Sequence, residues 1–306
     1  MKLLIAGASG FIGRQLIDAI KNEHQVTALG RDLAHLKRLF PSSVTHADWS
    51  MLDNLPAAEF DAVMNLSGHN IGASRWSDTV KQQIIRSRVD TTHKLIRWIK
   101  QQQASPHFYC ANAVGIYGAQ ANGDPVAFDE DSVIDEQHPK DYLQEVGVRW
   151  QQALDEAYDI QLPVTITRFG VVLKRHEGML KKLAPSFNLG LGSIFGDGTQ
   201  ILSWIHYLDV VEALRFLLAH PALHGAINIT SPNPVSQAEF ARALAKAMNR
   251  PLFLKTPALA IKLLLGEMGE MLVLKGQRVI PSRLLKAGYR FRFADITSAL
   301  REEYRT

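Results

Sequence analysis

Short apolar runs alternate with helical patterns along the first two thirds of the chain. The apolar runs predict strands near residues 2–6, 25–29, 43–47, 60–66, 107–113, 163–171 and 226–230. Apolar residues at helical spacing predict helices near 12–22, 78–102, 141–158, 207–219 and 236–248. Strands that alternate with helices form βαβ units with right-handed crossovers. The pattern therefore predicts an α/β fold with a doubly wound parallel sheet and helices on both faces.

A glycine-rich turn, Gly7-Ala8-Ser9-Gly10-Phe11-Ile12-Gly13, follows the first predicted strand directly. A strand, a Gly-x-x-Gly-x-x-Gly turn and a helix in this order form the context of a dinucleotide-binding loop. Gly7 would make the tight turn, Gly10 would let the backbone approach a pyrophosphate, and Gly13 would let the helix pack close to the sheet. A plain structural turn is the alternative. We expect a Rossmann-type fold that binds a nicotinamide dinucleotide, with this loop and the end of the fourth strand contacting it through Gly7, Ser9, Gly10, Phe11, Ile12, Gly13, Leu66, Ser67 and Gly68.

The end of the second predicted strand indicates which dinucleotide is bound. An NAD site places a carboxylate there for the ribose 2′-hydroxyl, whereas the 2′-phosphate of NADP needs a cation. This strand ends in Gly30-Arg31, so Arg31 could hold the phosphate and Asp32 would cap the next helix. A solvated surface role for Arg31 is the alternative. We predict NADP (NADPH) as the cofactor.

Beyond Val172 the alternation stops, and glycines and prolines become frequent. We read 173–206 as loop and short elements over the site, and 250–293 as a small separate lobe. The predicted domains are a Rossmann domain over 1–172, joined by 207–231, and a smaller C-terminal substrate-binding lobe from 173–206 and 232–306, which includes the segment 250–300.

Composition narrows the classes of function. The net charge of +4 comes without a Lys/Arg run, which argues against a nucleic-acid partner. The chain contains no uninterrupted stretch of about 18 apolar residues, so no membrane span is predicted. The lone Cys110 lies in an apolar run, so we expect a buried strand residue and no disulfide within the chain. Met1 and Lys2 lead directly into the first strand, so we expect no targeting segment and a cytoplasmic location.

Motifs from end to end resemble the extended short-chain dehydrogenase/reductases, and more narrowly their sugar-nucleotide epimerase branch, often labelled epimerase family protein. Besides the glycine loop, the matching stretches are Asn65-Leu66-Ser67-Gly68, Ser87-Arg88-Val89-Asp90-Thr91-Thr92, Ala113-Val114-Gly115-Ile116-Tyr117-Gly118, Arg168-Phe169-Gly170-Val171-Val172-Leu173, Leu202-Ser203-Trp204-Ile205-His206 and Asn228-Ile229-Thr230-Ser231-Pro232-Asn233-Pro234-Val235. The tail, with Leu263-Leu264-Leu265-Gly266-Glu267 and Gly276-Gln277-Arg278-Val279-Ile280-Pro281, resembles the C-terminal segment of unknown function in that branch.

The resemblance implies a Tyr-x-x-x-Lys pair assisted by a Ser and often an Asn, and this chain departs at most of those places. The nearest tyrosine is Tyr142, but Val146 stands where the lysine belongs. Asn112 replaces the Ser and Arg88 the Asn. An isolated tyrosine keeps a pKa near 10 and is a poor base at neutral pH. We nevertheless name Asn112, which could polarise a carbonyl, and Tyr142 as the catalytic candidates. A partly buried aromatic is the alternative for Tyr142, and Arg88 would supply the missing cation if it reached the site.

Further polar residues have two interpretations each. Glu130 is an acid over the site or part of a solvated loop, and Arg168 holds a phosphate or a neighbouring loop. His206 is a general base or a packed structural residue, whereas Arg75 and Lys81 could meet an anionic substrate. No cluster has metal-ligand spacing, so no metal is predicted.

Two functions remain open at this stage. The first is an NADP(H)-dependent oxidoreductase or epimerase that acts on a small polar substrate, for which a nucleotide sugar is one possibility. The second is a non-catalytic NADP(H)-binding sensor or regulatory protein, because the usual catalytic pair is missing and some relatives in this branch carry a cell-division label. A homodimer is the default expectation for the assembly, from the use of the 78–102 and 141–158 helices in many relatives.

Overall fold

The computed structural model describes residues 1–305, and its centre is a seven-stranded sheet. The strand order is β11-β6-β5-β4-β1-β2-β3, and every neighbouring pair is parallel. The strands are β1 (Lys2–Ala6), β2 (Gln25–Gly30), β3 (Thr45–Asp48), β4 (Ala62–Asn65), β5 (His107–Ala113), β6 (Val164–Phe169) and β11 (Gly225–Ile229). The predicted doubly wound parallel sheet is confirmed.

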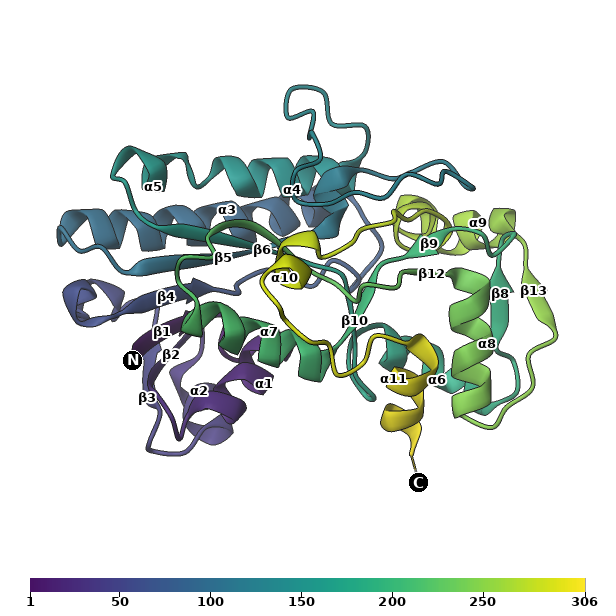
Figure 1. The fold of residues 1–306 in the computed structure, drawn as a ribbon, viewed down its shortest axis with the longest axis horizontal. Helices are drawn as coiled ribbons and strands as arrows, with labels where there is room; N and C mark the ends of the chain where they lie inside the picture. Colours follow the sequence, from purple (N-terminus) through teal and green to yellow (C-terminus); the bar gives the residue numbers. More distant parts are fainter. Residues whose placement is uncertain (306) are drawn as a thin grey trace.

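Helices cover both faces of this sheet (Figure 1). One face carries α3 (Asp78–Gln101), α4 (Tyr142–Gln152) and α5 (Asp155–Asp159), and the other carries α1 (Phe11–Ile20), α2 (Leu33–Leu39) and α7 (Tyr207–Ala219). Because helices cover both sides of the sheet, its central strands have no solvent-facing side, as in β4, whose four residues are all buried. Short 3₁₀ turns complete this part of the chain: η1 (Leu52–Asn54), η2 (Ala57–Glu59) and η3 (Val114–Tyr117).

The strand order reverses beside β1, which lies between β2 and β4. All seven strands are parallel, so the loops after Ala6, Gly30, Asn65 and Ala113 leave the same edge of the sheet. Ligands of open α/β sheets bind in the crevice at such a reversal point, outside the carboxyl ends of the strands.

Two predicted elements are each divided in the structure. The strand expected over 163–171 breaks at Gly170, after which β7 (Val171–Leu173) pairs with β10 (Trp204–His206) outside the main sheet. A Cβ at Gly170 would lie 2.7 Å from the Ser203 carbonyl oxygen, so the chain can make this transfer only with glycine. The helix expected over 141–158 is interrupted between α4 and α5. The helix α2 was expected only as the helix that Asp32 would cap, and without bounds, because only Leu36 of its seven residues is buried.

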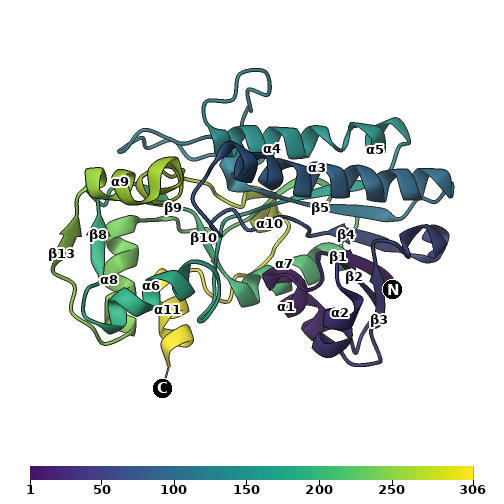
Figure 2. The ribbon, with the colours of Figure 1, turned by 180° about the vertical axis from the view of Figure 1, so that it is seen from behind.

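The remaining elements form a second body beside the sheet, at the right of Figure 1 and the left of Figure 2. It contains α6 (Gly178–Asn188), β8 (Ser193–Phe195), β9 (Ile201–Leu202), β12 (Val235–Ser236), α8 (Gln237–Ala247), β13 (Leu254–Thr256), α9 (Ala258–Gly269), the π-helical turn η4 (Glu270–Leu274) and α11 (Ile296–Tyr304). It has its own apolar core, which includes Phe187, Trp204, Phe240 and Leu300.

The prediction that 173–206 contains only loop and short elements is wrong, because α6 is an 11-residue helix. Its sequence carries Pro185 in the interior, a residue that normally ends a helix. The reading of 250–293 as a separate lobe is also incomplete. Although β13 pairs with β8 in the smaller body, α10 (Ser282–Lys286) returns to the main sheet, where Leu284 joins the large core. No helix within residues 1–305 is long and apolar enough to cross a membrane.

Candidate functional site

The glycine loop after β1 is packed so tightly that side chains would collide with it. Gly7 has a φ of +76°, and a Cβ there would lie 2.6 Å from the carbonyl carbon of Leu66 at the end of β4. A Cβ at Gly13 would lie 2.5 Å from the Gly7 carbonyl oxygen, and one at Gly10 would lie 3.0 Å from the same oxygen. The turn, the close approach to β4 and the packing of α1 on the loop therefore each require glycine.

The N-terminus of α1 is open toward this loop. Gly10 is the N-cap residue, and no side chain caps the helix. The N–H groups of the first helical turn start with those of Phe11 and Ile12. No carbonyl of a preceding helical turn is present to accept hydrogen bonds from them. Unpaired N–H groups and the positive end of the helix dipole form a binding site for an anion such as a pyrophosphate.

The end of β4 presents a polar atom that lacks a partner. Asn65 is fully buried, and its Oδ1 accepts from the Ser67 N–H at 3.1 Å while its Nδ2 donates to Thr92 Oγ1 at 3.0 Å. These two hydrogen bonds of the Asn65 side chain shape the segment Leu66-Ser67-Gly68 beside Gly7. The Ser67 hydroxyl is buried without a hydrogen-bond partner among residues 1–305. A buried hydroxyl is normally hydrogen-bonded, so this site fits a polar ligand such as the ribose of a dinucleotide.

The end of β2 is arranged as the sequence predicts. The Asp32 side chain accepts from the His35 N–H at 2.9 Å and caps α2, which confirms its predicted role. Arg31 is exposed and forms no ion pair or hydrogen bond with residues 1–305. Its guanidinium is therefore free to meet a phosphate beside the crevice.

The two catalytic candidates contact different parts of the protein. The Asn112 Nδ2 donates to the Gly147 carbonyl at 3.0 Å, and its Oδ1 accepts from the Ala113 N–H at 2.8 Å. The Tyr142 hydroxyl donates to the Lys81 carbonyl at 2.8 Å, and the ring packs 4.8 Å from that of Trp76. No hydrogen bond joins Asn112 to Tyr142 among the described residues. Burial raises the pKa of Tyr142 to about 12, although the charge of Arg88 opposes the shift.

Arg88 does reach the site, from the middle of α3. Its Nη1 donates to the carbonyls of Ile84 at 2.8 Å and His69 at 3.2 Å. Its Cζ lies 5.0 Å from the centre of the Trp150 ring, and 3.2 Å from where a Cβ of Gly68 would be. Removal from water lowers the pKa of Arg88 to about 10. The residue remains a cation at neutral pH.

Side chains of the smaller body close over the same edge of the sheet. Lys81 pairs with Glu267 of α9 at 2.5 Å, so this lysine is held by a carboxylate of the chain itself. Glu177, the N-cap residue of α6, pairs with Arg14 of α1 at 2.6 Å. Lys182 of α6 donates to the Gly72 carbonyl. The sequence did not reveal these partners, because they are separated by more than one hundred residues and no local pattern relates them.

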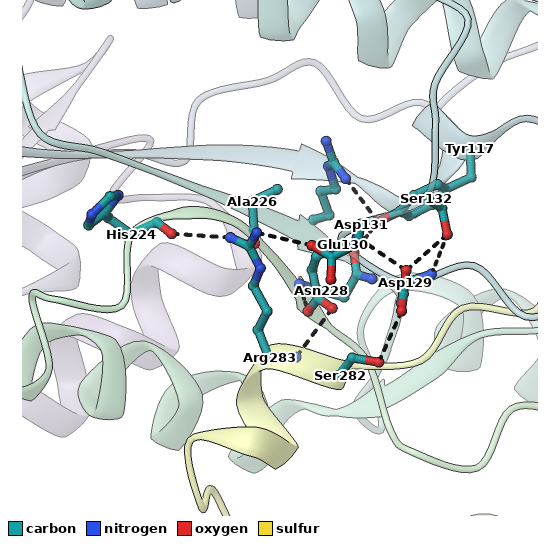
Figure 3. A network of polar contacts seen from close by, with 11 residues as sticks. Tyr117, Asp129, Glu130, Asp131, Ser132, His224, Ala226, Asn228, Ser282 and Arg283 are labelled. Atoms are coloured by element: carbon teal, nitrogen blue, oxygen red, sulfur yellow. Dashed lines mark hydrogen bonds and ion pairs between the residues drawn. The ribbon is translucent and has the colours of Figure 1, made fainter.

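Glu130 belongs to a buried network, not to a solvated loop (Figure 3). Its carboxylate accepts from the Asn228 N–H at 2.9 Å and from the Arg283 N–H at 3.2 Å. Asn228 also accepts from the Tyr117 hydroxyl at 2.8 Å, to which Arg168 donates at 2.8 Å. Burial raises the pKa of Glu130, and the two backbone N–H groups oppose that shift. The network fastens the C-terminal segment to the edge of the main sheet, so Arg168 and Glu130 have structural contacts here.

His206 is fully buried and caps α7. Its Nδ1 faces the Leu208 N–H at 3.3 Å, and its Nε2 lies 2.8 Å from Glu303 of α11. The packed structural interpretation of this residue agrees with these contacts. Within residues 1–305 no group of three His, Cys, Asp or Glu side chains could hold a metal ion.

Comparison with known proteins identifies the family. Residues 3–230 match the NAD dependent epimerase/dehydratase family, and residues 256–303 match a domain of unknown function, DUF1731. The chain is 35% identical over 302 residues to an epimerase family protein of Mycobacterium bovis, which covers 97% of this chain and 95% of that protein. It is 36% identical over 310 residues to a chloroplastic epimerase family protein of Arabidopsis thaliana, a match that covers 98% of this chain and 86% of that protein.

Solved structures agree with this result. The crystal structure of the human epimerase family protein SDR39U1 with NADPH superposes with a TM-score of 0.87 at 28% identity, over 99% of both chains. A UDP-glucuronic acid 4-epimerase from Bacillus cereus with NAD superposes with a TM-score of 0.76 at 18% identity. The match covers 99% of this chain and 96% of that chain, so the two proteins share the fold. The resemblance inferred from the sequence motifs is thus confirmed: the chain belongs to the NAD dependent epimerase/dehydratase family and carries the DUF1731 domain at its C-terminal end.

Proposed function

We propose that this protein is an NADP(H)-dependent oxidoreductase or epimerase that acts on a small polar substrate. The observation that carries the choice of cofactor is the unpaired Arg31 at the end of β2, where an NAD site would need a carboxylate. The open α1 N-terminus and the unpartnered Ser67 hydroxyl support a dinucleotide in the crevice. The NADPH in the human relative supports the same cofactor.

Each part of the crevice has a task in this proposal. Gly7, Gly10 and Gly13 keep the loop open to the pyrophosphate, and Arg31 binds the 2′-phosphate. Leu66-Ser67-Gly68 lines the ribose, with the Ser67 hydroxyl donating to it. A bound nicotinamide supplies or accepts a hydride. The contacts of Glu267, Glu177 and Lys182 hold the smaller body over the crevice and so help to exclude water.

Asn112 and Tyr142 are the candidates for the groups that move protons in this enzyme proposal. Both side chains are hydrogen-bonded within the protein, so either must exchange its present partner to meet a substrate. The Tyr142→Phe variant tests the second candidate. If Tyr142 donates the proton, turnover falls at least tenfold while NADPH affinity stays unchanged. Unchanged turnover removes Tyr142 from the mechanism.

The same contacts favour a second candidate function, a non-catalytic NADP(H)-binding sensor or regulatory protein. Val146 supplies no charge to Tyr142, whose raised pKa keeps the hydroxyl protonated at neutral pH. In this case NADPH would bind without redox turnover of any substrate, and a partner protein would respond to the bound state.

The enzyme proposal has two further parts, a nucleotide sugar as the substrate and a homodimer as the assembly. Each is tested by an experiment of its own.

Calorimetric titration of the purified protein, with NADPH and then with NADH, is the first test. Tight binding of NADPH and much weaker binding of NADH is the expected result. Equal affinities would contradict the role of Arg31, and binding of neither would contradict the proposed function as a whole. Absorbance assays of NADPH with nucleotide sugars and small carbonyl compounds then separate the enzyme from the sensor.

A further inference from the structure

Arg88 is a cation without a counter-ion at the edge of the crevice. No carboxylate among residues 1–305 forms an ion pair with it, whereas Lys81 on the same helix is paired with Glu267. Its Nη1 is used by two backbone carbonyls, of Ile84 and His69. Its Nε and Nη2 have no partner among the described residues. The Arg88 side chain is partly exposed, but protein surrounds most of the guanidinium, and a cation in such surroundings without an opposite charge is costly.

The free side of Arg88 lies beneath the segment that ends β4. Gly68 is exposed, and a Cβ there would lie 3.2 Å from the Arg88 Cζ and 3.3 Å from its Nη2. Since glycine has no side chain, only the backbone of residue 68 packs on the guanidinium. The adjacent Ser67 carries the unpartnered hydroxyl. The Ser67 hydroxyl and the Arg88 Nε and Nη2, which have no partner among the described residues, therefore belong to the same part of the crevice edge, where the proposed function places the nicotinamide half of a dinucleotide.

The geometry of a guanidinium restricts what can satisfy it. Its Nε and Nη2 form a planar pair of donors that matches two oxygens of one oxyanion. The Trp150 ring, 5.0 Å from Cζ, holds the plane of the guanidinium in place. Arg88 thus has one edge fixed by the protein and one edge available for a bidentate contact.

We propose that Arg88 binds an oxyanion of the substrate, a carboxylate or a phosphate group placed beside the carbon that exchanges hydride. This inference rests on the proposed NADP(H)-dependent function and names the substrate class for it: an acidic compound, not a neutral one. Arg88 would then be a catalytic-site residue that orients the substrate.

The test uses the full chain saturated with NADPH, and its probes are oxalate, inorganic phosphate and the neutral oxamide. Tryptophan fluorescence reports binding, because Trp150 adjoins the guanidinium; the Trp150→Phe variant shows which signal comes from that one of the 5 tryptophans. We expect saturable binding of an anion and none of oxamide. A stronger response to oxalate assigns a carboxylate substrate, and a stronger response to phosphate assigns a phosphorylated one.

Two substitutions complete the test. Arg88→Gln removes the charge and retains a donor for the Ile84 carbonyl, so anion affinity should fall roughly 10- to 100-fold with little change in NADPH affinity. Arg88→Lys keeps the charge without the planar edge and should give an intermediate loss. If either variant fails to fold, the wild-type titration with matched oxalate and oxamide still decides.

Three outcomes overturn the inference. One is that the NADPH-bound wild type binds no anion, and another is that Arg88→Gln binds oxalate and phosphate as well as the wild type does. The third is a collapse of NADPH affinity in Arg88→Gln, which would assign Arg88 to the cofactor instead. Failure of the wild type to bind NADPH is a different result, because it contradicts the proposed function itself.

Discussion

At the scale of the residue, single atoms decide what the crevice can accept. Arg31 and Asp32 are neighbours, yet Asp32 is occupied as a helix cap and Arg31 has no protein partner. The residue that could repel a phosphate is therefore tied to the backbone of α2, and the residue that attracts one is free.

Replacing Arg31 by Ala should weaken NADPH binding roughly 10- to 100-fold, because charge-assisted hydrogen bonds to the 2′-phosphate are lost. NADH affinity should stay the same, since NADH lacks that phosphate. Calorimetric titration of both cofactors measures the change. Arg38→Ala, an exposed arginine on α2, is the matched control. An equal loss for both cofactors would show that Arg31 only maintains the fold.

Replacing Gly13 by Ala adds only one methyl group, yet it should disturb the cofactor loop strongly. The new methyl group would lie 2.5 Å from the Gly7 carbonyl oxygen, which is backbone and cannot rotate away. We expect a loss of stability of about 1–3 kcal/mol and at least tenfold weaker NADPH binding. Chemical denaturation and calorimetry measure the two effects. Gly123→Ala, in a loop where a Cβ meets nothing within 4 Å, controls for the substitution, although its φ of +84° carries some strain of its own. Normal binding in Gly13→Ala would show that the loop can shift.

At the scale of the element, contacts between neighbouring strands and helices set the local charge states. His107 begins β5, and its Nε2 lies 2.8 Å from the Thr165 hydroxyl of β6. Burial, and to a smaller extent the charge of His224, lowers the pKa of His107 to about 4. The folded protein thus keeps this imidazole neutral at a pH where the unfolded chain would protonate it.

The stability contributed by this neutral His107 should be complete above pH 6.5 and should decrease as the pH falls from 6.5 toward 4. In that window the unfolded state binds one more proton than the folded state. His107→Gln cannot titrate, so the stability of the wild type relative to this variant should fall by on the order of 1 kcal/mol between pH 7 and pH 5, with allowance for solvent screening. Urea denaturation of both proteins at the two pH values measures it. A constant difference would mean that His107 is protonated equally in both states.

At the scale of the whole molecule, the chain crosses between its two bodies several times. The segment after η4 returns to the main sheet, where Glu130 binds the N–H groups of Asn228 and Arg283 (Figure 3). Three distant parts of the sequence meet at this one carboxylate. The C-terminal segment is therefore an integral part of the fold around the main sheet.

Replacing Glu130 by Ala should leave one buried and one partly buried N–H group unpaired and cost about 2–4 kcal/mol. The C-terminal segment should then exchange its amide hydrogens faster, which hydrogen-exchange mass spectrometry detects between residues 276 and 286. Asp131→Ala is the matched control, because Asp131 is the exposed neighbour that pairs with Arg283 at 3.2 Å. We expect less than about 0.5 kcal/mol for the control. Equal effects of the two variants would contradict the special role of Glu130.

The sequence by itself determined the parallel sheet, the glycine loop, the Asp32 cap and the family. These depend on local periodicity and on residues that touch their neighbours in the chain, as Gly10 and Gly13 touch Gly7. The helix α6 was missed because the glycines of 173–206 indicated a loop, although Gly178 alone lies in the helix, at its first residue.

Only the tertiary structure decided the environment of the charged side chains. Lys81 and Arg88 lie on one helix, and nothing in the sequence shows which of the two cations has a counter-ion. Glu267, which reaches Lys81 from 186 positions away, neutralises that cation, and no carboxylate of residues 1–305 does the same for Arg88. Charge interactions act through space and depend on burial, so the residues that remain free for a ligand become visible only when the distant parts of the chain have been brought together.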